Sequence, residues 1–212
     1  MAKLRHGILG PLTGKIGPVV AVLRNKKVYI RALPKKSNKP RTEKQIASQE
    51  KFKLVHQVIR PLKPYLCEGF KHLVFYKTAM DLAFTLNYHR AVLGTYPDLQ
   101  VDYSQLVIAE GRLLPLKDPL MVLAPGNQLK ISWAVEWRPY SKYDDQVMLV
   151  LYCPALSLAD GSIHMGIRFQ QECLFTINKR MKGHDVHVFV VLIAGNGNEA
   201  SNSQYLGRVV PL

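Results

Sequence analysis

Ten basic side chains between residues 15 and 44 have the type and spacing to contact a polyanion. Lysine and arginine neutralise phosphates and release their counterions, and this kind of binding does not require reading of the bases. We expect these residues to lie on a β-hairpin and on the loop that leaves it. The ten are Lys15, Arg24, Lys26, Lys27, Arg31, Lys35, Lys36, Lys39, Arg41 and Lys44.

The charge is distributed very unevenly along the chain. Residues 1–95 contain 19 Lys+Arg and 4 Asp+Glu, whereas residues 96–212 contain 10 and 11, so the first part holds the whole excess of +14. A concentrated positive surface attracts nucleic acid or an acidic protein at long range. The alternative is a solvated positive surface, or one whose charge is matched by a protein neighbour.

Aromatic residues of this part give little support to base stacking. Phe52, Phe70 and Phe84 have the spacing of a helical core, where they would not reach a nucleic acid. The part also lacks the motifs of RNA-recognition, KH and zinc-finger modules. The expected contact is therefore with a charged backbone.

Other chemistry finds no support in the sequence. The segment Gly10–Ile16 resembles a phosphate-binding loop, but its glycines are too close together and Ile16 stands where Ser or Thr is needed. His184 and His187 should point to opposite faces of a strand over 185–193, and Asp144-Asp145 is expected in a solvated turn. We predict no metal, no cofactor and no catalytic residues, and hence that the protein is not an enzyme.

The cysteines and the apolar runs suggest the compartment. Cys67, Cys153 and Cys173 are few and odd in number, which argues against a disulfide framework and for a reducing compartment. The N-terminus has no apolar stretch typical of a signal peptide, and no apolar run is long enough to span a membrane. We expect a cytoplasmic protein that does not contact membranes.

The basic part should form a hairpin followed by two helices. Val19–Leu23 and Val28–Arg31 are β-branched runs on either side of a short polar turn. Thr42 and Gln45 have the form of a capping box that begins a first helix, and helical spacing predicts a second helix over about 66–92.

The second part has an all-β pattern. About seven short strands indicate a β-sandwich, with Trp133 as a core aromatic and turns at Asp160-Gly161 and Asn196-Gly197. The clearest strands are 129–135, 147–152, 163–169, 173–177 and 186–193. This pattern resembles fibronectin type III and immunoglobulin-like sandwiches. The predicted fold class is α+β in two modules: residues 1–95, a basic hairpin-plus-helices module, and residues 118–212, a sandwich, with 96–117 as connector.

Clustered motifs suggest a family. The segments Gly7–Gly10, Thr13–Val20, Pro40–Gln45 and Gly94–Asp98 resemble an uncharacterised family from Bacteroidota, recognised by an Asn-Pro-Arg-Thr element. Here Lys39 separates the asparagine from Pro40. The N-terminal pattern is also similar to hypothetical proteins of phage and prophage origin, which implies a structural or assembly role.

These observations lead to three hypotheses. The first is a non-enzymatic binding or structural protein whose basic module engages nucleic acid or an acidic protein, while the sandwich mediates protein contacts. The second is a purely structural subunit of a larger phage-like or secretion-like assembly, with self-assembly. The third is an enzyme whose site is dispersed along the chain.

Overall fold

The backbone divides into two units, one before and one after the boundary between Thr42 and Glu43. A computed structural model describes residues 3–4, 11–24, 27–35, 39–136 and 142–211. Its two compact units are Met1–Thr42 and Glu43–Leu212. The fold is mixed α+β, as the sequence predicts, but the sequence-based division placed the helices with the hairpin and set its boundary after residue 95.

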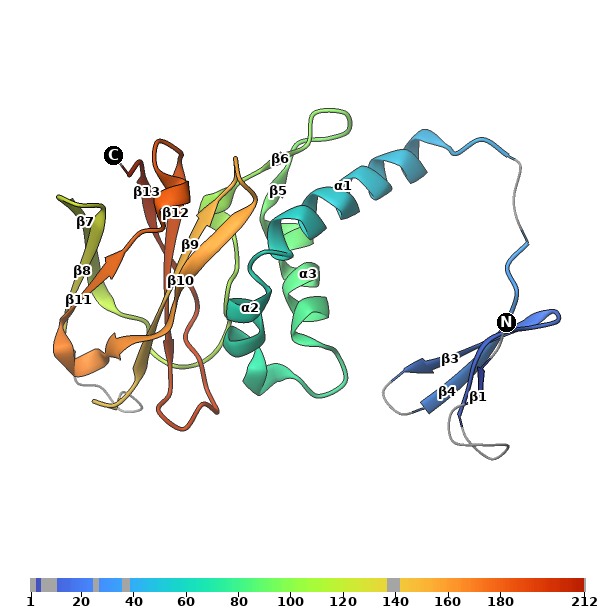
Figure 1. Ribbon diagram of the computed structural model, residues 1–212, viewed down its shortest axis with the longest axis horizontal. Coiled ribbons are helices and arrows are strands. Elements are labelled where there is room, and N and C mark those ends of the chain that lie inside the picture. Colours follow the sequence, from blue (N-terminus) through green and yellow to red (C-terminus); the bar gives the residue numbers. More distant parts are fainter. Residues whose placement is uncertain (1–2, 5–10, 25–26, 36–38, 137–141, 212) are drawn as a thin grey trace. The chain divides into compact units, whose positions relative to one another are not determined.

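The first unit is an antiparallel sheet (Figure 1). Its strands are β1 (Lys3–Leu4), β2 (Leu12–Ile16), β3 (Val19–Arg24) and β4 (Lys27–Ala32), in the order β1-β2-β3-β4. The predicted hairpin is confirmed, because Arg24 pairs with Lys27 across a two-residue connection. Within the described part of this unit no helix covers either face of the sheet.

Three α-helices begin the second unit: α1 (Glu43–Ile59), α2 (Lys63–Gly69) and α3 (Ala79–Arg90). Helix α1 begins directly after Thr42, as predicted. The prediction of a single helix over about 66–92 is wrong, because α2 ends at Gly69 and α3 begins only after Thr78. Thr78 forms a capping box with Asp81. Gly69 packs closely against the backbone at Ile108, so that a Cβ at this position would be 2.6 Å from the Ile108 carbonyl oxygen.

The rest of the second unit is mainly antiparallel sheet. One sheet has the strand order β10-β9-β12-β13, a second has β11-β8-β7, and a short third pairs β5 with β6. The strands are β5 (Val92–Leu93), β6 (Gln100–Val101), β7 (Lys117–Ala124), β8 (Gln128–Ala134), β9 (Gln146–Cys153), β10 (Leu158–Ile167), β11 (Glu172–Thr176), β12 (Val186–Ile193) and β13 (Gln204–Val209). Short 3-10 turns lie at η1 (Lys71–Leu73), η2 (Tyr103–Gln105), η3 (Arg168–Gln170) and η4 (Lys179–Met181).

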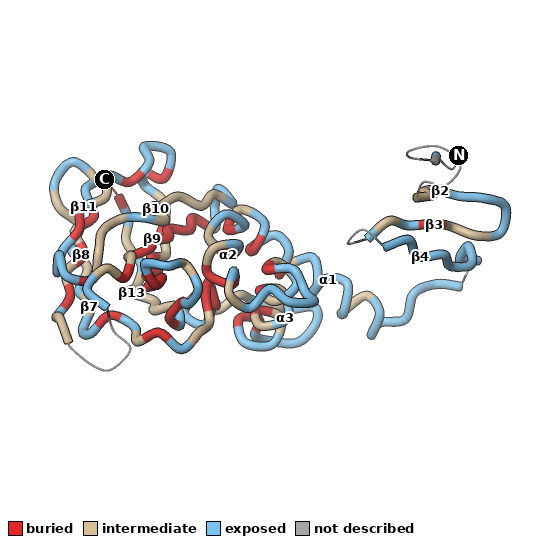
Figure 2. The backbone as a smooth tube through the Cα atoms, turned by 90° about the horizontal axis from the view of Figure 1, so that it is seen from below, coloured by how far each residue is buried: buried red, intermediate tan, exposed pale blue. Residues whose placement is uncertain are grey.

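In the sheet β10-β9-β12-β13, the two central strands, β9 and β12, are buried on both faces. Their residues Leu149 and Val190 share a core with the three-stranded sheet, including Trp133. On the opposite face, Val150 and Phe189 share a core with the helices. Figure 2 shows the buried backbone concentrated in these strands and in the helices that pack on them. The order of layers is therefore sheet, sheet, helices, and the helices belong with the β-rich region.

Two local expectations for this region are wrong. Asp160-Gly161 is not a turn, because both residues lie inside β10, where Gly161 has φ +140° and its missing side chain leaves room for the Leu149 carbonyl oxygen. Asp145 is not in a solvated turn, since it is fully buried. The predicted turn at Asn196-Gly197 is present, with the Gly197 amide donating to the Ala194 carbonyl at 2.7 Å.

Candidate functional site

The strand register of the first unit sorts its side chains onto two faces. Lys15 pairs with Val20, and Val20 pairs with Arg31, so these three side chains form one row across β2, β3 and β4. Arg24 pairs with Lys27 at the end of the hairpin. Because alternate residues of a strand share a face, the side chains of Lys15, Arg24, Lys27 and Arg31 all lie on the same face as Tyr29. We call this set of five residues the basic face.

The opposite face of the same sheet is apolar. It carries Ile16, Val19, Ala21, Leu23, Val28 and Ile30. Ala21 is buried, but Ile30 is 65% exposed. One side of the sheet is therefore wholly apolar, whereas the other carries all the strand cations together with Tyr29, Val20 and Val22.

Charge on the basic face is not balanced from within the unit. Residues 1–42 contain 11 Lys+Arg and no Asp or Glu. Arg24 and Lys27 stand directly opposite each other, an arrangement that costs stability when both partners carry the same charge. An anion lying over this face would relieve that repulsion.

The dimensions of the basic face suit a nucleic-acid backbone. Alternate strand residues are about 6.8 Å apart, so Lys27 and Arg31 are separated by about 14 Å along β4. Lys15 and Arg31 are two strand spacings apart, which is about 10 Å. Phosphates of one DNA strand follow each other at about 3.4 Å along the helix axis, so the patch spans several of them.

The ten residues singled out from the sequence do not all lie on this face. Four of them do. Lys35, Lys39 and Arg41 are exposed on the segment that follows β4, and Lys44 is exposed in the first turn of α1. Lys26 and Lys36 lie outside the described residues.

Sequence reasoning overlooked Tyr29. Its side chain is 55% exposed and lies between Lys27 and Arg31 on the basic face, where an aromatic ring is available for stacking. The signal was present in the alternation Lys27-Val28-Tyr29-Ile30-Arg31, in which polar and aromatic residues occupy one side of the strand and aliphatic residues the other.

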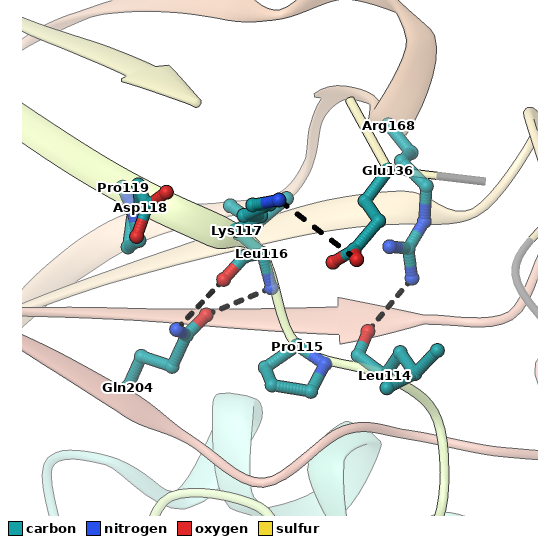
Figure 3. A pocket seen from close by; sticks show the side chains of 9 residues that line it. All are labelled: Leu114, Pro115, Leu116, Lys117, Asp118, Pro119, Glu136, Arg168 and Gln204. Atoms are coloured by element: carbon teal, nitrogen blue, oxygen red, sulfur yellow. Dashed lines mark hydrogen bonds and ion pairs between the residues drawn. The ribbon is translucent and has the colours of Figure 1, made fainter. Parts of the chain in front are cut away.

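The second unit contains a pocket of about 330 Å³ beside Arg168 (Figure 3). Its polar groups bind one another: Gln204 bridges the amide and carbonyl of Leu116, and Arg168 Nη2 donates to the Leu114 carbonyl at 2.7 Å. Arg168 Nε also lies 3.0 Å from Asp145 Oδ2, and both side chains are buried. These contacts hold the Leu114–Pro119 segment against the sheets, so we assign this site a structural role.

Neither a metal-ion site nor a membrane-spanning helix is present among the described residues. There, no group of three or more His, Cys, Asp or Glu side chains is arranged to hold a metal ion. No helix in the same part of the chain has enough length and apolar character to cross a bilayer.

Comparison with known proteins supplies a family and no relative of known function. No curated protein and no solved structure matches the chain. One family model, described as a family of unknown function, covers residues 11–207 and so includes β2–β4, the helices and all but the end of β13 in the two larger sheets of the second unit. The chain therefore belongs to the family DUF6266.

Proposed function

We propose that this protein binds nucleic acid, without catalysis, through the basic face of its first unit. The observation that carries the proposal is the register of β2–β4, which gathers Lys15, Arg24, Lys27 and Arg31 on one side of a sheet. Such a surface binds phosphates by releasing counterions and holds the strand without reading its sequence.

Two features favour nucleic acid over an acidic protein. Tyr29 lies between the cations of β4, and mixed aromatic and cationic surfaces are typical of single-strand binding, in which bases stack on the rings. The cations are also spaced regularly along and across the strands, which suits a repeating polyanion. An acidic protein becomes the partner to test if nucleic acid fails the test below.

The test measures affinity of the full chain for a short DNA, single-stranded and duplex, by fluorescence anisotropy over a series of salt concentrations. The test variant is Lys15→Gln with Lys27→Gln and Arg31→Gln. The matched control is Lys63→Gln with Lys77→Gln and Lys142→Gln, which removes the same charge from exposed positions of the second unit.

We expect the test variant to bind more weakly and to lower the slope of log K against log salt by about 3, one for each lost phosphate contact. The control should keep the slope of the wild type. Equal slopes for the two variants would place the contact elsewhere, and an absence of binding by the wild type at low salt would remove nucleic acid as the partner.

We further infer that the two-sheet region has an immunoglobulin-like or fibronectin type III-like architecture and serves protein contacts. Its strand order supports this assignment, since β7, β8 and β11 form one sheet and β10, β9, β12 and β13 form the other. Both sheets are antiparallel, and Trp133 of β8 is buried between them.

A second candidate role is that of a structural subunit in a larger assembly. The apolar face of the first unit favours it, since a sheet normally buries such a face against another layer. Light scattering of the wild type and of Ile30→Lys tests this role. Particles larger than a monomer that dissociate in the variant support assembly, whereas a monomeric wild type contradicts it.

We also propose that the protein works in the cytoplasm. Cys67, Cys153 and Cys173 are free thiols, and the last two are buried. Burial, aided by the charge of Glu172, raises the pKa of Cys173 to about 11, so this thiol stays protonated and unreactive at neutral pH. Three unpaired thiols suit a reducing compartment.

A further inference from the structure

A second hollow in the second unit combines aromatic rings with charge. It has a volume of about 560 Å³, within the range of small-molecule sites. It lies at one end of β12 and β13, and its walls come from η2, from the turn after β9 and from the segment between η4 and β12. The lining residues are Tyr103, Pro154, Ala155, Gly183, His184, Asp185, His187 and Arg208.

A stacked pair of rings forms one side of this pocket. Tyr103 and His187 have ring centroids 4.3 Å apart and planes inclined by 29°. His187 Nδ1 is 2.9 Å from the hydroxyl of Tyr205, which fixes the orientation of the imidazole. Nε2 of His187 has no hydrogen-bond partner among the described residues, so it is available to a ligand.

Burial lowers the pKa of His187, and the nearby Arg208 adds to this effect while Asp185 opposes it. The imidazole is therefore neutral at neutral pH. A neutral ring stacked on a phenol presents a flat surface with one hydrogen-bonding nitrogen, which suits a planar heterocycle.

The rim of the pocket carries groups for an anion. Arg208 lies 3.1 Å from Asp185, and both side chains are largely exposed, at 61% and 50%. Outside the lining itself, the segment directly before Gly183 carries three exposed cations, Lys179, Arg180 and Lys182. Residues 96–212 as a whole carry slightly more acidic than basic side chains, so this concentration of positive charge is local.

The sequence-based expectation that His184 and His187 diverge depended on a strand beginning at 185. In the structure β12 begins at Val186, so His184 precedes the strand and the alternation of faces does not apply to it. Both histidines line the same pocket.

We propose that this pocket binds a nucleotide, with the base against the Tyr103–His187 pair and the phosphate at Arg208 and the Lys179–Lys182 turn. Nε2 of His187 and the carboxylate of Asp185 are then the groups that hydrogen-bond the base or the ribose. A neutral sugar would use the aromatic ring and Asp185, but it would leave the cations without a role. The nucleotide is either free or the 5′-phosphorylated end of a strand.

Isothermal titration of the full chain with AMP, GMP, CMP and UMP, with adenosine and with inorganic phosphate tests the proposal. Tyr103→Leu keeps an apolar side chain but removes the flat ring, and Arg208→Gln removes the phosphate contact. The matched control is Arg90→Gln, because Arg90 is also half-exposed and lies 3.1 Å from a carboxylate, that of Glu110. Circular dichroism verifies that each variant is folded.

We expect at least one mononucleotide to bind, and Tyr103→Leu to weaken it by about tenfold or more. Arg208→Gln should lower the affinity for the mononucleotide but leave any affinity for adenosine unchanged. Arg90→Gln should change neither affinity. Competition by phosphorylated and unphosphorylated oligonucleotides then separates a strand end from a free nucleotide.

No binding of any mononucleotide at millimolar concentration, or equal effects of Arg208→Gln and Arg90→Gln, overturns the proposal. If Tyr103→Leu fails to fold, the comparison of Arg208→Gln with Arg90→Gln alone tests the proposal. The outcome is independent of the basic face, because the Lys15, Lys27 and Arg31 variant should bind mononucleotides as the wild type does even where it loses DNA.

Discussion

Arg168 and Asp145 form a buried ion pair, with Nε of the arginine 3.0 Å from Oδ2 of the carboxylate and both side chains withdrawn from solvent. The same two residues are joined through their backbones, since the Arg168 amide donates to the Asp145 carbonyl at 2.8 Å. The Arg168 carbonyl in turn accepts from the indole of Trp133 at 2.7 Å. The pair thus connects the loop before β9 to the core between the two larger sheets.

Breaking this pair should destabilise the protein strongly. Arg168→Met leaves the Asp145 carboxylate buried without its partner, and we expect a loss of about 3–5 kcal/mol in the free energy of unfolding. Urea denaturation measures it. Arg208→Gln, which breaks an exposed pair, is the control and should cost no more than about 1 kcal/mol. Similar losses for the two variants would show that burial of the pair contributes little.

Tyr29 should matter more for single strands than for duplexes. On the basic face its ring can stack on an unpaired base, a contact of about 1–3 kcal/mol in other single-strand-binding proteins. Tyr29→Ala should therefore lower the affinity for single-stranded DNA by about tenfold and change the affinity for duplex DNA little. Tyr29→Phe should retain both affinities. Fluorescence anisotropy at one fixed salt concentration compares them; equal losses for both kinds of DNA would argue against stacking.

Gly161 should tolerate no side chain. Its φ of +140° is unfavourable for other residues, and a Cβ would collide with the carbonyl oxygen of Leu149 on the neighbouring strand. Gly126 has φ +79° but open space around it, so Gly126→Ala should cost about 1–2 kcal/mol, from the backbone alone. Gly161→Ala should cost clearly more. Thermal and urea unfolding of the two variants, measured together, give the additional cost at Gly161 of the collision and of its less favourable φ.

Acid should destabilise the protein partly through His187. Its pKa in the folded state is lowered from 6.5, chiefly by burial, so below about pH 6.5 the unfolded chain binds the proton more readily than the folded one. The contribution of His187 to the free energy of unfolding is fully present above its pKa in the unfolded chain. It is lost as the pH falls toward its pKa in the folded protein. Urea unfolding should show a shallower acid loss for His187→Gln than for the wild type; parallel curves would contradict this assignment.

Cys67 should be the only thiol that reacts readily in the folded protein. It is exposed, whereas Cys153 and Cys173 are buried, and the pKa of Cys173 is raised to about 11. A colorimetric thiol titration should therefore find one reactive group under native conditions and all three in denaturant. Cys67→Ser should abolish the native reaction. Rapid reaction of that variant would indicate opening of the sheet cores.

The basic face could have been derived from the sequence, whereas the pocket could not. Alternation in Lys27–Arg31 and the short turn after Arg24 together determine which cations share a side, because a two-residue connection sets the hairpin register. The pocket brings Tyr103 next to His187 and Arg208, which are far away in the chain. Local patterns contain no information on such a long-range arrangement.

The position of the helices can also be derived from the sequence. Val147–Cys153 and Val186–Ile193 are almost continuously apolar, and a strand of this kind is typical of a sheet covered on both faces. A two-sheet sandwich covers only one face of each sheet. The helical segments were the remaining layer, and the capping residues Thr78 and Asp81 marked where the last of them begins.

Strands β9 and β12 separate two hydrophobic cores and contribute side chains to both. Successive residues such as Val150 and Leu151 face different layers, so removal of the helices would leave a whole row of aliphatic and aromatic groups in contact with water. The β-rich region is therefore not a separable building block. A fragment restricted to it would expose the helix-facing side of the central sheet to water and would lose the packing that stabilises that side. Any engineered truncation must therefore keep the chain from Glu43 onward.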